Sequence, residues 1–171
     1  MPLDQVPEDL AKASLALELA TWPEAVEASG EDGPAFVVKR PGAIAFFAMD
    51  TELLGYAEVF PRTIFSEDGP METWGLGSVC VTKERQGEGI GRKIVEACFQ
   101  EVDRHKGVSL FQTGVPGFYE KLNCEAVHNR FINKLDKEQP EANPFWDEYV
   151  MIYPKGAKWP TGTIDLNGKG Y

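Results

Sequence analysis

The stretch VCVTKERQGEGIGRKIVEACFQ, residues 79–100, decides the fold of this chain. Its apolar beginning predicts the end of a strand, QGEGIG at 86–91 predicts a glycine-rich turn, and the remainder predicts a helix. Apolar residues recur at every fourth position from Ile90 to Val102, so they share one helix face. Alternate glycines before a helix leave backbone N–H groups open at its positive end. The stretch therefore predicts a pyrophosphate site at the turn.

Length and composition predict one soluble domain. The chain has 171 residues, of which 43% are hydrophobic and 26% charged. Its net charge of −10 argues against nucleic acid as a partner. The sequence shows neither a leader nor an apolar run that could span a bilayer, so we expect a cytoplasmic protein with no membrane contact. Four basic residues nevertheless surround the glycine turn, as an anionic cofactor would require: Lys83, Arg85, Arg92 and Lys93.

Three cysteines, Cys80, Cys98 and Cys124, lie far apart among apolar neighbours. They are too few and too scattered for a disulfide framework or a zinc site. We therefore expect buried, reduced thiols and no metal.

The rest of the chain predicts a mixed α/β sheet with helices on both faces. A helix at 8–19 is expected to bury Leu10, Ala13, Leu17 and Ala20. Gly107 is expected to end the central helix, and Asn123 to adopt a left-handed cap. Gly75 and Gly77 are expected to mark either a bulge or the close approach of another group. In chain order, the remaining expected elements are a strand at 1–6, a helical turn at 23–28, an extended segment at 35–39, strands at 44–49 and 53–60, a loop at 61–70, strands at 73–81 and 108–112, a helix at 116–122, and paired strands at 126–135 and 147–153.

The last residues, 158–171, are glycine-rich and show no periodicity. Two alternatives stay open for them. They either close over an acceptor site, with Asp165 or the Tyr171 carboxylate facing a cationic amine, or they form a surface strap or dimer contact.

Two motifs resemble those of the GNAT N-acetyltransferase superfamily. Gln86-x-x-Gly89-x-Gly91 after a strand resembles its acetyl-CoA signature, and GFYEKLNC at 117–124 resembles its second motif. A dinucleotide fingerprint would place the third glycine one residue later, and a P-loop would need Gly-Lys-Ser/Thr. The resemblance covers about residues 44–153 of what we expect to be a single domain, 1–171. Residues 54–64, LGYAEVFPRTI, also resemble the aminoglycoside 2′-N-acetyltransferase subgroup.

The resemblance implies a mostly antiparallel central sheet that is splayed between its fourth and fifth strands, 73–81 and 108–112. Acetyl-CoA would lie in that opening, with its pantetheine arm paired to the fourth strand and its pyrophosphate on the turn. A backbone N–H of the same strand would meet the thioester oxygen. The implied cofactor-binding residues are Val79, Cys80, Val81, Gln86, Gly87, Glu88, Gly89, Ile90, Gly91 and Arg92.

Tyr119 matches the superfamily tyrosine that protonates the departing thiolate. A phenol, with a pKa of about 10, suits that role because it stays protonated at neutral pH. The identity of the general base stays open. The position of the glutamate in the aminoglycoside subgroup falls at Gly77, which leaves Glu58 and Glu72, acting through water, as candidates. Ser78 is a third option, as a residue that orients a water.

The resemblance implies an acetyl-CoA-dependent N-acetyltransferase. We expect direct transfer, in a ternary complex, to a primary amine of a small molecule, with Trp74 a candidate for the acceptor pocket and a homodimer left open. The alternatives are a non-catalytic acyl-CoA-binding sensor, and an enzyme of the same fold that acetylates a protein amine or an aminoglycoside.

Overall fold

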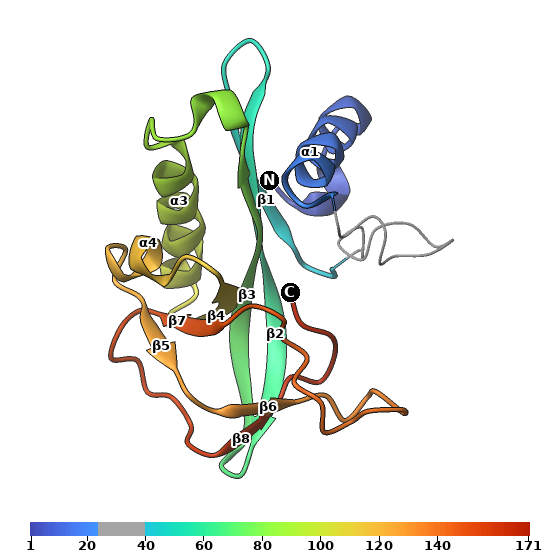
Figure 1. Ribbon diagram of the computed structural model, residues 1–171, viewed down its shortest axis with the longest axis vertical. Helices are drawn as coiled ribbons and strands as arrows, with labels where there is room; N and C mark the ends of the chain where they lie inside the picture. Colours follow the sequence, from blue (N-terminus) through green and yellow to red (C-terminus); the bar gives the residue numbers. More distant parts are fainter. Residues whose placement is uncertain (24–39) are drawn as a thin grey trace. The chain divides into compact units, whose positions relative to one another are not determined.

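The computed structural model describes residues 1–23 and 40–171 (Figure 1). The extended segment expected at 35–39, and all but the first residue of the helical turn at 23–28, lie outside the described residues. The chain forms two compact units, which are treated separately below. Unit 1 contains residues 1–60 and 76–100, and unit 2 contains residues 61–75 and 101–171.

Unit 1 begins with an irregular segment in place of the expected strand at 1–6. Residues Leu3–Gln5 form a 3-10 turn, η1, and only Pro2 makes a β-bridge, with Ile44. The other elements of unit 1 are α1 (Glu8–Thr21), β1 (Ile44–Met49), the first part of β2 (Leu53–Ser66), the last part of β3 (Gly69–Val81), η4 (Lys83–Arg85) and most of α3 (Ile90–Arg104).

The hairpin of β1 and β2 confirms the predicted pairing of residues 44–49 with 53–60. Its register runs from Ile44↔Val59 to Ala48↔Gly55, with one irregularity before Met49. The loop expected at 61–70 is wrong, because β2 continues to Ser66 and β3 starts at Gly69. The β-branched and aromatic residues Thr63, Ile64 and Phe65 favour a strand here, despite the prolines at both ends of the segment.

Helices cover both faces of the unit 1 sheet, as predicted (Figure 1). On one face, Tyr56 and Cys80 pack against the segment that includes Leu17 of α1. On the other face, a Cβ on Gly55 would lie 2.6 Å from Ile94 of α3. These two faces follow from the alternation of side chains along a strand.

The buried side of α1 is rotated from the predicted one. Ala20 is exposed, whereas Ser14 and Glu18 are buried at 6% and 5% exposure. Small and polar residues at i and i+4 therefore occupy the stripe closest to the sheet, and the leucines flank it. This rotation places a carboxylate against β-strands.

Unit 2 contains short strands around one helical turn. Its elements are the last part of β2, the first part of β3, the end of α3, β4 (Ser109–Thr113), α4 (Pro116–Glu120), β5 (Glu125–Val127), β6 (Arg130–Ile132), β7 (Tyr149–Tyr153) and β8 (Thr163–Asp165). β3 pairs with β4 in parallel at Trp74↔Ser109 and Gly75↔Leu110, and β7 pairs antiparallel with both β4 and β5.

Two details of unit 2 differ from the prediction. The strand expected at 126–135 is split into β5 and β6, and between them Asn129 donates hydrogen bonds of 3.0 Å to the carbonyls of Pro160 and Gly162. The left-handed residue after α3 is Lys106, at φ 51°, rather than Gly107. Asn123 does adopt the expected left-handed conformation, at φ 63°.

The tail, in which the sequence showed no periodicity, carries a short strand. β8 pairs in parallel with β6 and antiparallel with β2 at Phe65↔Asp165. Asp165 Oδ1 accepts backbone hydrogen bonds from Lys134 and Asn167, at 3.1 and 2.9 Å. The Tyr171 ring lies against Phe145 and the Arg62 guanidinium. The tail is thus an integral part of unit 2, which favours the strap alternative.

The strand order β5-β7-β4-β3-β2-β8-β6, with β1 on β2, confirms a mixed α/β sheet. It is antiparallel in most of the recorded pairs and parallel at β3·β4 and β6·β8. Within the described ranges, the helices are too short or too polar to cross a membrane.

Replacing Gly55 with alanine should destabilise the protein. The new methyl group would lie 2.6 Å from Ile94 Cδ1 and 3.0 Å from the Cys80 carbonyl oxygen. Overpacking of this kind costs ~1–3 kcal/mol, which a lower urea midpoint would show. Gly117→Ala is the matched control, because open space surrounds its Cβ position. Equal midpoints for the two variants would contradict this account of the β2–α3 packing.

Candidate active site

The glycine turn has the geometry of an anion cradle. Gly87 and Gly89 adopt left-handed φ angles of 83° and 80°, and among the described residues no atom lies within 4 Å of a Cβ added at either. Lys93 N–H donates to the Gly89 carbonyl at 3.1 Å, so Gly89 caps α3. The N–H groups from Gly89 to Arg92 therefore precede the first helical hydrogen bond and point outward from the positive helix end.

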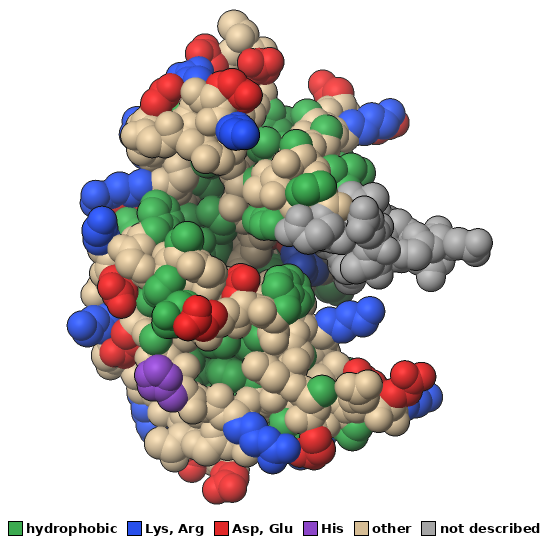
Figure 2. Space-filling view, in the orientation of Figure 1, with side chains coloured by type: hydrophobic (Ala, Val, Ile, Leu, Met, Phe, Trp, Pro, Cys, Tyr) green, Lys and Arg blue, Asp and Glu red, His purple; other side chains and the backbone are tan. Residues whose placement is uncertain are grey.

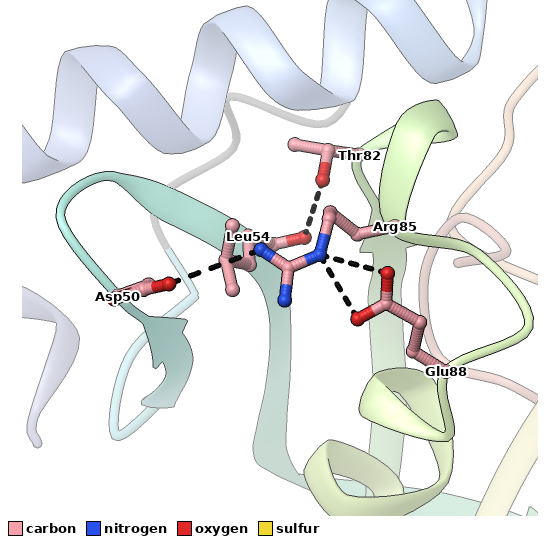
Figure 3. A network of polar contacts seen from close by, with 5 residues as sticks. All are labelled: Asp50, Leu54, Thr82, Arg85 and Glu88. Carbon is pink, nitrogen blue, oxygen red and sulfur yellow. Dashed lines mark hydrogen bonds and ion pairs between the residues drawn. The ribbon is translucent and has the colours of Figure 1, made fainter.

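Side chains brace this turn from outside (Figure 3). Arg85 Nε donates to both carboxylate oxygens of Glu88 at 2.9 Å, and its Nη1 lies 3.9 Å from Asp50 in the β1–β2 turn. Thr82 Oγ1 donates to the Leu54 carbonyl at 3.3 Å. Because the Glu88 side chain is turned to Arg85, its contribution to an anion site is its backbone.

The end of β3 presents backbone groups away from β2. Thr82 N–H donates to Leu54 of β2 at 2.9 Å. Backbone groups of successive strand residues alternate in direction, so Cys80 also faces β2, whereas Val79 and Val81 face the opposite side. On that side, Gln86 Nε2 donates to the Val81 carbonyl at 3.2 Å. Of the three expected strand residues, Val79 and Val81 thus have the orientation for pairing, and Cys80 does not.

β3 is irregular at Ser78, which adopts a left-handed φ of 57° within the strand. A Cβ on Gly77 would face Glu58, and Cys80 packs with Tyr56, which is two residues from Glu58 on β2. Gly77 and Cys80 therefore point to the same face although three positions separate them. A regular strand would place them on opposite faces, so Ser78 is the extra residue of a bulge.

A buried polar cluster lies on this face, under α1. Glu58 is 3% exposed; its Oε2 accepts a hydrogen bond of 3.3 Å from Tyr56 Oη, and its Oε1 forms an ion pair with Arg40 Nη1. The Arg40 guanidinium also lies 4.5 Å from the centre of the Phe60 ring. A carboxylate that is shielded from water requires such partners.

Glu18 of α1 belongs to the same cluster. Burial raises the pKa of this carboxyl from 4.5 to about 7, against the opposing effects of the nearby Ser78 side chain and the Arg40 charge. Within the described ranges, Glu18 Oε1 has no hydrogen-bond partner. Sequence reasoning missed Glu18, but its place four residues after Ser14 on the buried helix stripe is a signal that could have found it.

The thiols are not suited to nucleophilic chemistry. Burial raises the pKa of Cys80 and of Cys124 to about 12, and it raises the pKa of Cys98 as well. All three are buried and free of disulfides, as predicted. A thiol that remains protonated at neutral pH is a poor nucleophile, so covalent catalysis by Cys80 is disfavoured.

Unit 2 holds the remaining candidates. Tyr119 in α4 is 6% exposed and packs against Phe111 and Phe118. Glu72 is exposed and accepts a hydrogen bond of 2.6 Å from Thr63 Oγ1. Trp74, expected as a pocket residue, stacks on His105 at 4.6 Å between ring centres.

Residues 36–123 match the family model described as an acetyltransferase (GNAT) domain. The chain belongs to the GNAT acetyltransferase family. This confirms the predicted class of enzyme, an N-acetyltransferase that uses acetyl-CoA as acyl donor. In this GNAT domain, the matched segment includes the glycine turn, the bulged strand and Tyr119. A comparison with curated protein sequences gives no match.

Solved structures share the fold at low sequence identity. A GNAT family acetyltransferase from Brucella melitensis in complex with acetyl-CoA is 19% identical, with 94% of this chain and 91% of that chain covered and a TM-score of 0.58. An aminoglycoside 6′-N-acetyltransferase complexed with coenzyme A is 21% identical, with 89% of this chain and 94% of that chain covered and a TM-score of 0.59. Escherichia coli ElaA is 16% identical, with 89% of this chain and 95% of that chain covered and a TM-score of 0.58.

The surface of the GNAT domain carries mixed charge. Figure 2 shows acidic and basic side chains interspersed on the face it presents. In the part of the chain that the structure describes, His, Cys, Asp and Glu side chains form no group that could hold a metal ion.

Glu18→Gln should stabilise the GNAT domain at high pH. The carboxyl has a pKa of 4.5 in the unfolded chain and about 7 in the folded protein, so the folded state binds the proton more tightly and stability falls as pH rises between these values. One pKa unit corresponds to about 1.4 kcal/mol, so the ionisation of Glu18 lowers the free energy of unfolding by roughly 3 kcal/mol above pH 7.

Urea unfolding at about pH 4.5 and pH 8 measures this effect. The variant should exceed the wild type at the higher pH and lose most of that advantage at the lower one. Glu8→Gln, on the exposed side of the same helix, should show no such gain. A gain of equal size at both pH values would argue against a buried, titrating Glu18.

Proposed function

We propose that this GNAT domain transfers the acetyl group of acetyl-CoA to a primary amine of a small molecule, by direct attack in a ternary complex. The observation that carries the proposal is the buried carboxylate cluster beside the β3 bulge. A cation is the natural complement of buried carboxylates. Because Glu18 and Glu58 are 5% and 3% exposed, a small amine is favoured over an amine on a protein surface.

For the donor, we assign the pyrophosphate to the backbone amides of the turn and helix start. Positive φ at Gly87 and Gly89 and the open space around them support this assignment. We assign the pantetheine arm to the outward-facing backbone of Val79 and Val81, and one of their N–H groups to the thioester oxygen. The donor residues proposed are Val79, Val81, Gln86, Gly87, Glu88, Gly89, Ile90, Gly91 and Arg92, with Glu88 acting through its backbone.

In the proposed reaction, the neutral amine attacks the thioester carbonyl carbon and forms the new C–N bond. The C–S bond then breaks, the thiolate takes a proton, and the amine nitrogen loses one. We assign the first proton to Tyr119, whose phenol remains protonated at neutral pH. Its place in the second motif supports this role.

Of the two base candidates from the sequence, Glu58 is favoured for the acceptor site. Glu72 is exposed and already bound to Thr63, in keeping with a surface strand residue. Both oxygens of Glu58 have partners, in Arg40 and Tyr56. We therefore propose that Glu58 organises the acceptor site and adds negative charge, without taking the proton itself.

Two measurements test the function. Acetyl-CoA at about 100 times its dissociation constant should stabilise the domain by ~2.7 kcal/mol, visible as a thermal shift. Adding primary amines should then release free coenzyme A thiol. A shift without thiol release from any amine, peptide or aminoglycoside would indicate the non-catalytic sensor. Release with peptides alone would overturn the small-amine proposal, and release with aminoglycosides alone would select the aminoglycoside alternative.

Gly89→Ala should weaken acetyl-CoA binding at least ~10-fold. An alanine at φ 80° strains the turn and moves the amides that we assign to the pyrophosphate. Gly156→Ala is the matched control, because Gly156 has φ 77° and lies outside the proposed site. Calorimetric titration with acetyl-CoA measures both. Equal affinities would remove the turn from the donor site.

Tyr119→Phe should lower kcat ~100-fold and leave the acetyl-CoA dissociation constant unchanged, since only the proton donor is lost. Tyr153→Phe is the control; it removes a phenol that donates to Asp103 at 2.8 Å. Thiol release and calorimetry separate the two effects. Wild-type turnover in the Tyr119 variant would exclude the hydroxyl from the mechanism.

A further inference from the structure

We propose that Glu18 is the catalytic base, binding the ammonium group of the acceptor and removing its proton. The inference deepens the proposed function and rests on it. It assigns the role that the family resemblance left open at Gly77 to a residue from a different element, the first helix.

The geometry singles out Glu18 among the carboxylates. It lies on the buried stripe of α1, close enough to Ser78 of the bulge and to Arg40 for both to favour its charged form. Its Oε1 is buried and has no hydrogen-bond partner among the described residues. Both Glu58 oxygens, by contrast, are engaged. A buried oxygen without a donor is costly, and a substrate ammonium would supply three donors.

Gly77 provides room beside this cluster. A Cβ there would have its nearest described neighbours at 3.4 to 3.8 Å, in Arg40, Phe60 and Glu58. A methyl group would therefore fit in ordinary van der Waals contact at Gly77, the position at which the resemblance places the glutamate of the aminoglycoside subgroup. Glu18 brings a carboxylate to the same face from α1, the helix that covers it.

The charges of the cluster also favour a bound cation at Glu18. Among the described residues, the titratable groups recorded as interacting with Glu18 are Arg40 before β1, Tyr56 on β2 and Cys80 on β3, and Glu58 of β2 is ion-paired with the same Arg40. Burial raises the pKa of Tyr56 and of Cys80, so both remain neutral at pH 7. Arg40 then neutralises one of the two carboxylates. A bound ammonium group would neutralise the second.

The position along β3 suits the transfer. Ser78 immediately precedes the segment Val79–Val81, to which we assign the thioester. In the step proposed, a Glu18 carboxylate oxygen takes the first proton from the ammonium nitrogen, and the freed lone pair forms the C–N bond as the C–S bond breaks. The thiolate takes its proton from Tyr119. The second proton leaves the nitrogen for solvent, which also reprotonates Tyr119 and receives the proton from Glu18. A carboxyl with a pKa of about 7 is matched to this task at neutral pH.

The first experiment compares wild type, Glu18→Gln and Glu8→Gln. Thiol release from acetyl-CoA is followed with ethanolamine, 1,4-diaminobutane and tyramine across pH. Wild type should show an acid limb in kcat/KM with an apparent pKa near 7. Glu18→Gln should lower kcat/KM by ~100-fold or more and lose that limb. Glu8→Gln should match the wild type.

Controls separate the failure of this inference from that of the proposed function. Acetyl-CoA should bind Glu18→Gln as tightly as wild type, since the donor site is intact. Retention of the wild-type rate or acid limb in Glu18→Gln would overturn the role of Glu18 and leave the acetyltransferase standing. Loss of acetyl-CoA binding in the wild type would sink the proposed function itself.

A second measurement does not depend on turnover. With 13C-labelled glutamate, the Glu18 carboxyl resonance is the one that is missing from Glu18→Gln. It should titrate near pH 7 and shift when 1,4-diaminobutane is added to the full chain. If no amine of the panel is acetylated, the response of the Glu18 resonance to pH and to 1,4-diaminobutane alone decides whether Glu18 binds the amine. A titration near pH 4.5, or no response to the diamine, would overturn the inference.

Discussion

The burial of two carboxylates against one guanidinium is the constraint on which unit 1 depends. Both carboxylate oxygens of Glu58 have partners, in Arg40 and Tyr56. The Glu18 carboxylate is less well compensated for its burial, and its pKa is raised. A folded chain retains such an arrangement at a cost in stability, which is the pattern expected where a group is poised for function. The apolar alternative, a leucine at position 18, would carry no charge to desolvate and would leave the sheet without its second acid.

The bulge at Ser78 makes this arrangement possible. Without the extra residue, Gly77 and Cys80 would face opposite sides of the sheet. With it, the open position at Gly77 and the apolar anchor of Cys80 both face α1, and Val79 and Val81 turn their backbone groups away from β2. A single left-handed residue thus sets the direction of two sets of groups, one proposed for the donor and one for the acceptor.

The parts of the fold that sequence predicts are those with local causes. The glycine turn and the hairpin at 44–60 follow from residue spacing, and so does the left-handed Asn123. The elements it misses depend on distant partners: β8 exists because β6 and β2 offer it hydrogen bonds, and β2 runs through Pro61 because its neighbours favour a strand. The glycine turn is formed by residues that are close in sequence, so its motif can be recognised in the sequence. Glu18 and Arg40 join Glu58 only through the packing of α1, for which no short motif exists.

The three cysteines have a consequence for an enzyme of this class. Each turnover of an acetyl-CoA-dependent transferase releases a free thiol, and thiols form mixed disulfides with accessible protein cysteines under oxidising conditions. Here every cysteine is buried, and burial raises the pKa of all three thiols. The protein therefore offers its own product no thiolate with which to react, and it should resist self-inactivation by oxidised coenzyme A.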